Sequence, residues 1–250
     1  MIKGSFENIV GIMKFPPSLW PSRIIIDNYA WFAKMTDLAV YIKNSLIILG
    51  FGIVLLLLIC GLAGYAFSMF KFNGKKSIYL AFLISLMLPG QALVIAKFVV
   101  IKELGLLNSY MAVILPSIFS AVNIFLFKNY CDTIPVEIIE SGRMDGASEL
   151  QIFFKLILPL CKPIVGAIVI FNSIGLLSDY LWQMLMLRDA EIQTFLVRVI
   201  FVIMNNTSAE TNRIGISLAG GTLLFIPLLL CFCIFSRYFT KGLVLGAVKE

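Results

Sequence analysis

The sequence predicts an all-α fold, a polytopic bundle of transmembrane helices with five spans in this chain. Residues of the set AVILMFWYC make up 60% of the 250 positions, and charged residues make up only 14%, against about 25% in soluble domains. The mean hydropathy is +0.97. A soluble fold of this length cannot cover so much apolar surface, so the solvent around the chain must be lipid.

Each predicted span is an apolar run of about the 20 residues that cross a bilayer as a helix. The alternation of apolar and polar residues that marks barrel strands is absent. The fourth span is predicted to be kinked where it begins, by Pro159 and Pro163. The five spans cover approximately residues 45–70, 77–100, 110–130, 156–177 and 214–235.

The Lys and Arg residues between the spans predict the topology. The residues assigned to the cytoplasmic side by the positive-inside rule are Lys71, Lys75, Lys76, Lys128, Arg143, Lys155, Lys162, Arg237, Lys241 and Lys249. The loops on the other side carry fewer, namely Lys102, Arg188, Arg198 and Arg213. The net charge of +6 therefore reflects membrane topology. A nucleic-acid partner, which would need basic residues clustered on one polar face, is not expected.

Residues 1–43 are predicted to form an extracellular N-terminal segment ahead of a membrane domain at 44–250. Five spans with a cytoplasmic tail put the N-terminus outside, and prolines at 16, 17 and 21 interrupt the one short apolar patch of the segment. Because such a segment normally needs a preceding helix to be translocated, we expect another span upstream of residue 1. The alternative is that the segment stays in the cytoplasm and the first apolar run does not cross fully.

A polar block at 132–155 interrupts the apolar pattern between the third and fourth spans. Pro135 suits a first helical turn, where its missing N–H costs nothing, and the glutamates after it suit a helix N-terminus. Gly146 permits a turn, after which Ser148 and Gln151 have the spacing of a capping box. The block therefore predicts two short helices around a turn. An ordinary solvated cytoplasmic loop is the alternative.

The order of residues in this block resembles the EAA loop of bacterial ABC importer permeases. That motif has Glu-Ala-Ala, a later Gly and an Ile-x-Leu-Pro end. The matching positions are Glu140, Gly146, Leu158 and Pro159. The chain departs from the motif in having Ser141 and Gly142 for the two alanines and Leu156 for the isoleucine. These departures leave the helix before the turn less rigid and do not remove the match.

The resemblance extends over nearly the whole chain, to the maltose-permease-like carbohydrate importers. Its most specific stretch is "IFLFKNYCDTIPVEIIESGRMDGAS" at 124–148. Further stretches are "NSL" at 44–46, "GYAFSMFKFNGKK" at 64–76, "GLLNSY" at 105–110 and "KGLVLGAVKE" at 241–250. Members of that family usually have six spans, and the one absent here would precede residue 1.

The resemblance implies a permease subunit that moves a sugar or oligosaccharide across the cytoplasmic membrane. It implies four partners besides lipid: a second homologous permease, a pair of cytoplasmic ATPase subunits that carry ATP and Mg, an extracellular sugar-binding lipoprotein, and the carbohydrate. No cofactor is expected on this chain. The loop at 132–155 is implied to be a cytoplasmic coupling helix that docks on the ATPase. The residues assigned to that contact are Glu140, Ser141, Gly142, Asp145, Gly146, Ala147, Leu158 and Pro159.

The remaining residue types argue against catalysis or metal binding by this chain. The absence of histidine removes the usual general base and the commonest zinc ligand. No P-loop pattern is present, so ATP must be hydrolysed elsewhere. The five cysteines are interpreted as small hydrophobic residues. A permease for a non-sugar solute (a polyamine, phosphate or an amino acid) and a non-transporting membrane scaffold stay open as alternatives.

Three residues at the outer end of the fourth span, Asp179, Tyr180 and Trp182, are candidates for the substrate path. Their aromatic rings suit the C–H face of a sugar, and the carboxylate suits its hydroxyl groups. The alternative is an aromatic belt at the membrane boundary. Lys97, near the outer end of the second span, is interpreted as a side chain that extends to the interface.

Overall fold

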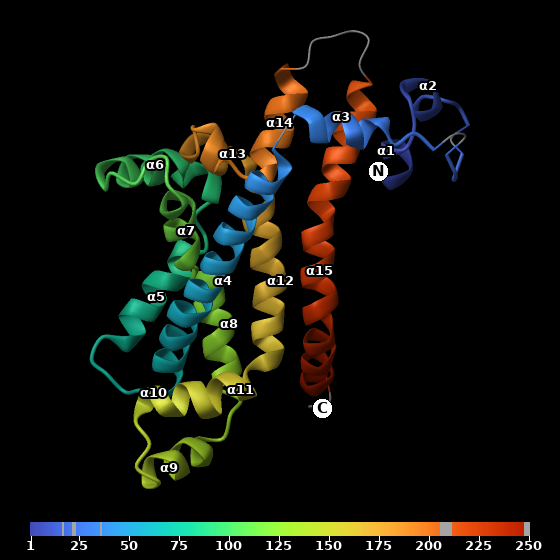
Figure 1. Cartoon of the computed structure of the whole chain (residues 1–250). Helices are drawn as coiled ribbons and strands as arrows, with labels where there is room; N and C mark the ends of the chain where they lie inside the picture. Colours follow the sequence, from blue (N-terminus) through green and yellow to red (C-terminus); the bar gives the residue numbers. More distant parts are fainter. Residues whose placement is uncertain (17, 22–23, 36, 206–211, 248–250) are drawn as a thin grey trace.

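Every regular element in the part of the chain that the structure describes is a helix, as predicted. The structure is a computed structural model, and it describes all residues except 17, 22–23, 36, 206–211 and 248–250. Two long helices, α4 (Leu38–Met69) and α15 (Arg213–Ala247), run along the molecule (Figure 1). Among the described residues two helices can cross a membrane alone, and the number rises to five if each of three bent helix pairs is one span.

The second predicted span is broken. α5 (Lys75–Ser85) is followed by the 3-10 turn η1 (Gly90–Leu93) and by α6 (Val94–Glu103), which leave at 101° to α5. Pro89 stands at the break with φ −65° and ψ 125°. Because proline has no N–H and disfavours helical geometry in the residue before it, the helix cannot continue through this point. The prediction of one continuous helix over 77–100 is therefore wrong.

The other two bends also lie near prolines. α7 (Tyr110–Ile118), which contains Pro116, meets α8 (Ala121–Cys131) at 43°. The segment Glu149–Leu160 meets α12 (Lys162–Ser178) at 80°. This last bend lies between the two prolines that were predicted to kink the start of the fourth span, so that prediction is confirmed.

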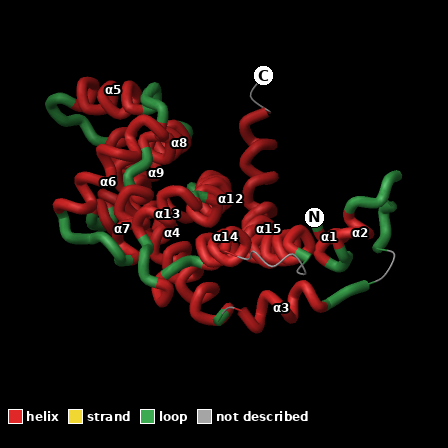
Figure 2. The backbone as a smooth tube through the Cα atoms, turned by 90° about the horizontal axis from the view of Figure 1, so that it is seen from above, coloured by secondary structure: helices red, strands yellow, loops and turns green. Residues whose placement is uncertain are grey.

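The helices are arranged around α4 and α12. α4 packs against α7, α8 and α12, and α12 packs against α15. Both views place α5 to α8 on one side of the molecule and α15 with the N-terminal helices on the other, with α12 between them (Figures 1 and 2). The largest side chains buried in this core are Phe127, Phe153, Ile48, Leu56, Ile114, Ile124, Ile139, Ile152, Ile157, Ile168 and Met186.

The contact between α4 and α8 depends on glycine. A Cβ atom on Gly64 would lie 2.5 Å from Phe127 Cβ and 2.9 Å from the backbone nitrogen of Lys128. A Cβ atom on Gly61 would lie 3.1 Å from the Phe153 ring. Small residues of this kind let helix backbones approach closely in lipid, where van der Waals packing drives helix association.

The two ends of the molecule carry different elements. α9 (Val136–Met144), α10 (Glu149–Ile152) and α11 (Leu158–Leu160) lie at the same end as the last turns of α15, and the N-terminus lies at the opposite end (Figure 1). The loop after α4 also reaches the α9 end, where Lys75 Nζ donates to Phe70 O at 2.9 Å and so neutralises the carbonyl end of α4. The basic residues of the loop after α4 and of the α9–α10 region therefore share one end, whereas Lys249 of the predicted set lies outside the described residues.

Three short helices, α1 (Ile2–Ser5), α2 (Ile9–Ile12) and α3 (Asp27–Met35), make up the N-terminal segment. None of them is long enough to span, as predicted. α4 already begins at Leu38, so the segment ends before the predicted boundary at residue 43. α1 and α3 both pack against α15.

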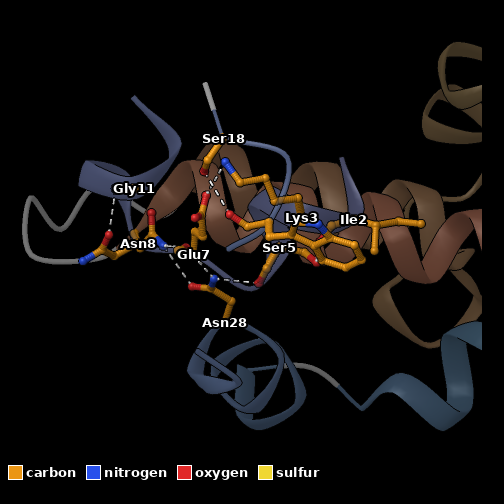
Figure 3. A network of polar contacts seen from close by, with 10 residues as sticks. Ile2, Lys3, Ser5, Glu7, Asn8, Gly11, Ser18 and Asn28 are labelled. Atoms are coloured by element: carbon orange, nitrogen blue, oxygen red, sulfur yellow. Dashed lines mark hydrogen bonds and ion pairs between the residues drawn. The ribbon is translucent and has the colours of Figure 1, made fainter. Parts of the chain in front are cut away.

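Buried polar contacts tie this segment together (Figure 3). Asn28 Nδ2 donates to the carbonyl oxygens of Ser5 at 2.8 Å and Glu7 at 3.1 Å. Lys3 and Glu7 form an ion pair at 3.1 Å. Asn212, just before α15, donates to Glu7 O at 2.7 Å. Because these groups are largely buried and paired, they fix the segment to the N-terminal end of α15.

The segment between α12 and α15 contains helices that the sequence pattern did not predict. α13 (Tyr180–Met186), the 3-10 turn η3 (Ala190–Ile192) and α14 (Phe195–Asn205) lie between α12 and α15. The buried Asn44 of α4 holds this region: its Nδ2 donates to Glu191 O at 2.8 Å and to Gln193 O at 2.9 Å.

Candidate functional site

The helix pair α9–α10 projects from the end of the molecule opposite the N-terminus (Figure 1). α9 follows Pro135, and Gly146 turns the chain with φ +76°. Ser148 Oγ then accepts from Gln151 N at 3.3 Å, and Gln151 Oε1 accepts from Ser148 N at 2.9 Å. The predicted capping box and the predicted turn are both confirmed. Each bond satisfies an amide that a helix start would leave unpaired.

The two faces of α9 differ in burial. Ile139 and Gly142 face the protein, and a Cβ atom on Gly142 would lie 3.0 Å from Leu156 Cδ1 and 3.3 Å from Ile152 Cγ1. Gly142, which stands where the EAA motif has its second alanine, therefore lies where α10 approaches α9 closely, and a larger side chain there would crowd α10. The residues of the pair that are exposed are Val136, Glu137, Glu140, Ser141, Arg143, Met144, Asp145, Gly146, Ser148, Leu150 and Gln151.

The predicted coupling residues are distributed over this region. Glu140, Ser141 and Asp145 lie on the exposed side, where Ser141 Oγ donates to Ile138 O at 2.9 Å. Ala147 is half-buried in the turn, and its N–H donates to Gly142 O at 3.0 Å. Leu158 and Pro159 lie apart from the others, next to the 80° bend that leads into α12: Leu158 is half-buried and Pro159 is exposed.

Sequence reasoning missed the residues that join this helix pair to α4. Arg143 Nε donates to Glu149 Oε1 at 2.7 Å, and Tyr65 Oη donates to Glu149 Oε2 at 2.8 Å. The Arg143 guanidinium also lies 5.9 Å from the centroid of the Phe70 ring. The carboxylate of Glu149 raises the pKa of Arg143 above its ordinary value, so this guanidinium stays charged. No spacing rule links these positions, because they meet only in the folded chain.

At the other end of the bundle an open cavity of about 610 Å³ lies between η1, α6, α7, α12 and α13; we call it the outer cavity. Asp179, Tyr180 and Trp182, the three predicted substrate-path residues, all line it. So does Lys97, which was interpreted only as a side chain that extends to the interface. The other polar residues of its wall are Gln91, Ser117, Ser120, Asn172 and Ser178.

The three predicted residues present different groups to the outer cavity. Trp182 is only 7% exposed, and its Nε1 donates to Ala112 O at 3.1 Å. Asp179 Oδ1 caps α13 by accepting from Trp182 N at 3.2 Å. Tyr180 is 48% exposed. The carboxylate of Asp179 and the ring of Tyr180 are therefore accessible, whereas the indole of Trp182 mainly anchors α13 to α7.

An asparagine pair joins the cavity wall to α8. Asn123 Nδ2 of α8 donates to Asn172 Oδ1 of α12 at 3.0 Å, and the Asn172 amide donates back at 3.2 Å. Neutral amide pairs of this kind hold two helices together in lipid. Across the described ranges no group of three or more His, Cys, Asp or Glu side chains could hold a metal ion.

Comparison with known proteins identifies the kind of chain that carries these features. Residues 3–244 match the family described as "Binding-protein-dependent transport system inner membrane component". The chain is 33% identical to the arabinooligosaccharides transport system permease protein AraQ of Halalkalibacterium halodurans, over 92% of this chain and 81% of that protein. It is also 33% identical to the lactose transport system permease protein LacG of Rhizobium radiobacter, over 90% of this chain and 81% of that protein.

The fold has a solved counterpart. A crystal structure of a bacterial ABC transporter involved in the import of the acidic polysaccharide alginate matches with a TM-score of 0.83 and 23% identity, covering 95% of this chain and 88% of that one. At that identity the likeness concerns the fold alone. The family match over most of the sequence, together with the apolar helices, leads to one conclusion: the chain belongs to the family of inner membrane components of binding-protein-dependent transport systems and is a multi-pass protein of the cytoplasmic membrane.

Proposed function

We propose that this chain is the permease subunit of an ABC importer that carries a sugar or oligosaccharide. The observation that carries the proposal is the outer cavity, whose wall combines amide, hydroxyl and carboxylate groups with an accessible tyrosine ring. Such a wall suits a solute with many hydroxyl groups and apolar C–H faces. Two relatives that are 33% identical are named for arabinooligosaccharide and lactose transport, which supports the same class of solute.

The proposal includes the partners of the permease. A second, homologous permease completes the path across the membrane, a pair of ATPase subunits binds ATP and Mg at the cytoplasmic end, and an extracellular binding protein delivers the solute. The family description names a binding-protein-dependent system, which supports the last partner. Within the outer cavity, Asp179 accepts hydrogen bonds from solute hydroxyls and Tyr180 contacts the C–H face.

A transport assay with purified components tests this function. The permease, its partner permease and the ATPase are reconstituted in proteoliposomes, and the binding protein is loaded with arabino-oligosaccharide or lactose. We expect ATP-dependent uptake of at least one sugar, and weaker uptake by Asp179→Ala. Spermidine, phosphate and glutamate are the controls, since polyamine, phosphate and amino-acid permeases are the alternatives. Uptake of one of these three in place of every sugar would contradict the proposal.

The helix pair α9–α10 is proposed as the coupling helix that docks on the ATPase. Its exposed side carries Glu140 and Asp145 beside Met144, which is 88% exposed. An exposed charge pair contributes about 0–1 kcal/mol, and more if it is desolvated on docking. Glu140→Lys, which reverses the charge, should therefore reduce transport more than Glu140→Ala. Equal transport by both variants and the parent protein would show that Glu140 lies outside the contact.

The N-terminal segment, predicted above over residues 1–43, is proposed to lie on the extracellular side, because α1, α2 and α3 sit at the end opposite the α9–α10 pair (Figure 1). A single cysteine at the exposed Ser18, in a variant whose native cysteines are replaced, should react with a membrane-impermeant maleimide on intact cells. A cysteine at the exposed Met144 is the matched control and should react only after lysis. Reaction of the Ser18→Cys variant only after lysis would place this segment in the cytoplasm.

A further inference from the structure

The carboxylate of Glu149 joins two helices that belong to different parts of the fold. One oxygen accepts from Arg143 Nε of α9 at 2.7 Å, and the other accepts from Tyr65 Oη of α4 at 2.8 Å. Glu149 itself is the first residue of α10. Both oxygens are therefore used, one toward the helix that projects from the molecule and one toward the long helix of the bundle.

Aromatic packing surrounds these two bonds. The Tyr65 ring lies 5.5 Å from the Phe70 ring and 5.8 Å from the Phe153 ring, between centroids. The Arg143 guanidinium lies 5.9 Å from the centroid of the same Phe70 ring. Tyr65 lies at the centre of this contact and is only 2% exposed. The contact therefore joins α4 to the residues before and after the Gly146 turn.

The two hydrogen bonds of Glu149 make it costly to separate the α9–α10 pair from α4. Hydrogen bonds to an ionised carboxylate are roughly twice as strong as those between neutral groups. If α9 and α10 moved away from α4 with Glu149, the buried Tyr65 hydroxyl would lose its acceptor, and a buried donor without an acceptor is costly. A displacement of the helix pair therefore moves α4 with it.

We propose that Glu149 is a positioning residue that fixes the α9–α10 pair to α4, so that a displacement of the coupling helix moves α4 directly as well as α12. The chain already connects the pair to α12 through the residues between Ile152 and Lys162. The hydrogen bonds of Glu149 add a second, non-covalent connection, from the helix pair to α4. This inference rests on the proposed contact between α9–α10 and the ATPase.

Two substitutions remove the connection with little change in shape. Tyr65→Phe removes only the hydroxyl and keeps the ring between Phe70 and Phe153. Glu149→Gln keeps the size of the side chain and removes its charge. Tyr130→Phe is the matched control, because Tyr130 is a partly buried tyrosine of the neighbouring helix α8 whose hydroxyl has no hydrogen-bond partner among the described residues.

A distance measurement tests the connection itself. Spin labels are placed on cysteines at Val136 of α9, which is not among the proposed contact residues, and at Lys71 after α4, both exposed, in the assembled complex with the native cysteines replaced. We expect one narrow distance distribution for the parent protein and the Tyr130→Phe variant, and a broader one for Tyr65→Phe and Glu149→Gln. An unchanged distribution in Tyr65→Phe and Glu149→Gln would overturn the proposal, and this result does not depend on which solute is carried.

A second measurement tests whether the connection transmits motion. In proteoliposomes the number of solute molecules imported per ATP hydrolysed should fall by about tenfold or more, because a hydrogen bond to a charged group is worth at least about that factor. ATPase binding and basal ATP hydrolysis should stay at the parent level. A broadened distance with an unchanged import-to-ATP ratio would also overturn the proposal. If the parent complex imports no sugar, the proposed function fails, and the distance measurement still decides whether Glu149 fixes the helices.

Discussion

Replacing Gly64 by alanine should destabilise the helix bundle because of one added methyl group. The new Cβ would lie 2.5 Å from Phe127 Cβ, whereas carbon atoms in good contact are about 3.5–4.0 Å apart. It would also lie 2.9 Å from Lys128 N and 3.2 Å from Ile124 O. These are backbone atoms of α8, so no side-chain rotation relieves the overlap and the helix itself must move.

The magnitude follows from overpacking. Inserting a methyl group into a well-packed contact costs about 1–3 kcal/mol. Gly50, on the same helix α4, is the matched control, because nothing lies within 4 Å of its Cβ position. Gly50→Ala should stabilise the helix by up to about 1 kcal/mol, the difference in helix propensity between the two residues. Because both variants gain the helix propensity of alanine, they should differ by the overpacking cost alone, about 1–3 kcal/mol in the free energy of unfolding.

Thermal unfolding of the purified complex, in detergent or in nanodiscs, measures this difference. For a chain of this size 1 kcal/mol corresponds to about 2–4 °C, so Gly64→Ala should unfold about 2–12 °C below Gly50→Ala. Identical melting temperatures for the two variants would refute the reasoning, because they would show that α8 can withdraw from α4 at no cost.

Two further substitutions test local features. The Gly146→Leu variant should insert normally, since nothing lies within 4 Å of the Cβ position, but φ +76° costs a leucine about 1–2 kcal/mol. Pull-down with this variant should recover less ATPase than with the parent, whereas Gly146→Asn should recover nearly as much as the parent. Equal recovery with Gly146→Leu would show that ATPase docking does not depend on this turn. Asn44→Ala leaves Tyr110, Glu191 and Gln193 without their partner and should lower the free energy of unfolding by about 3 kcal/mol. Tyr110→Phe removes only one of these three bonds and should cost less; the reverse order would contradict the assignment.

Local sequence rules predicted the local features. The capping box needs two residues three positions apart, and the turn needs one glycine, so both could be read directly from the chain. The bend at the start of α12 likewise follows from the proline ring. The prediction of one continuous helix over 77–100 failed because the helix-breaking effect of Pro89 was left out. Pro89 breaks the second span for the same reason that prolines bend the fourth.

Contacts between distant positions could not be predicted in this way. Tyr65 and Glu149 are 84 positions apart, and Asn44 and Glu191 are 147 apart. Their pairing depends on which helices become neighbours, which periodicity does not specify. The aromatic residues near Asp179 show the same limit of local sequence rules. Tyr180 and Trp182 are neighbours of Asp179 in the sequence, but only the fold shows that the Trp182 indole donates to Ala112 O, 70 positions away.

The break between α5 and α6 has a consequence for hydration. Around it, amides make only short-range bonds, such as Leu86 N to Leu83 O at 3.1 Å and Met87 N to Ile84 O at 3.0 Å. Hydrocarbon offers no partner for the peptide groups left over, so irregular backbone at membrane depth must border protein or water. Gly90 and Gln91, directly after the break, line the outer cavity. A water-filled outer cavity would supply the hydrogen-bond partners that these peptide groups lack in hydrocarbon, and a polar solute that enters it would exchange water for the side-chain amides and hydroxyls of its wall.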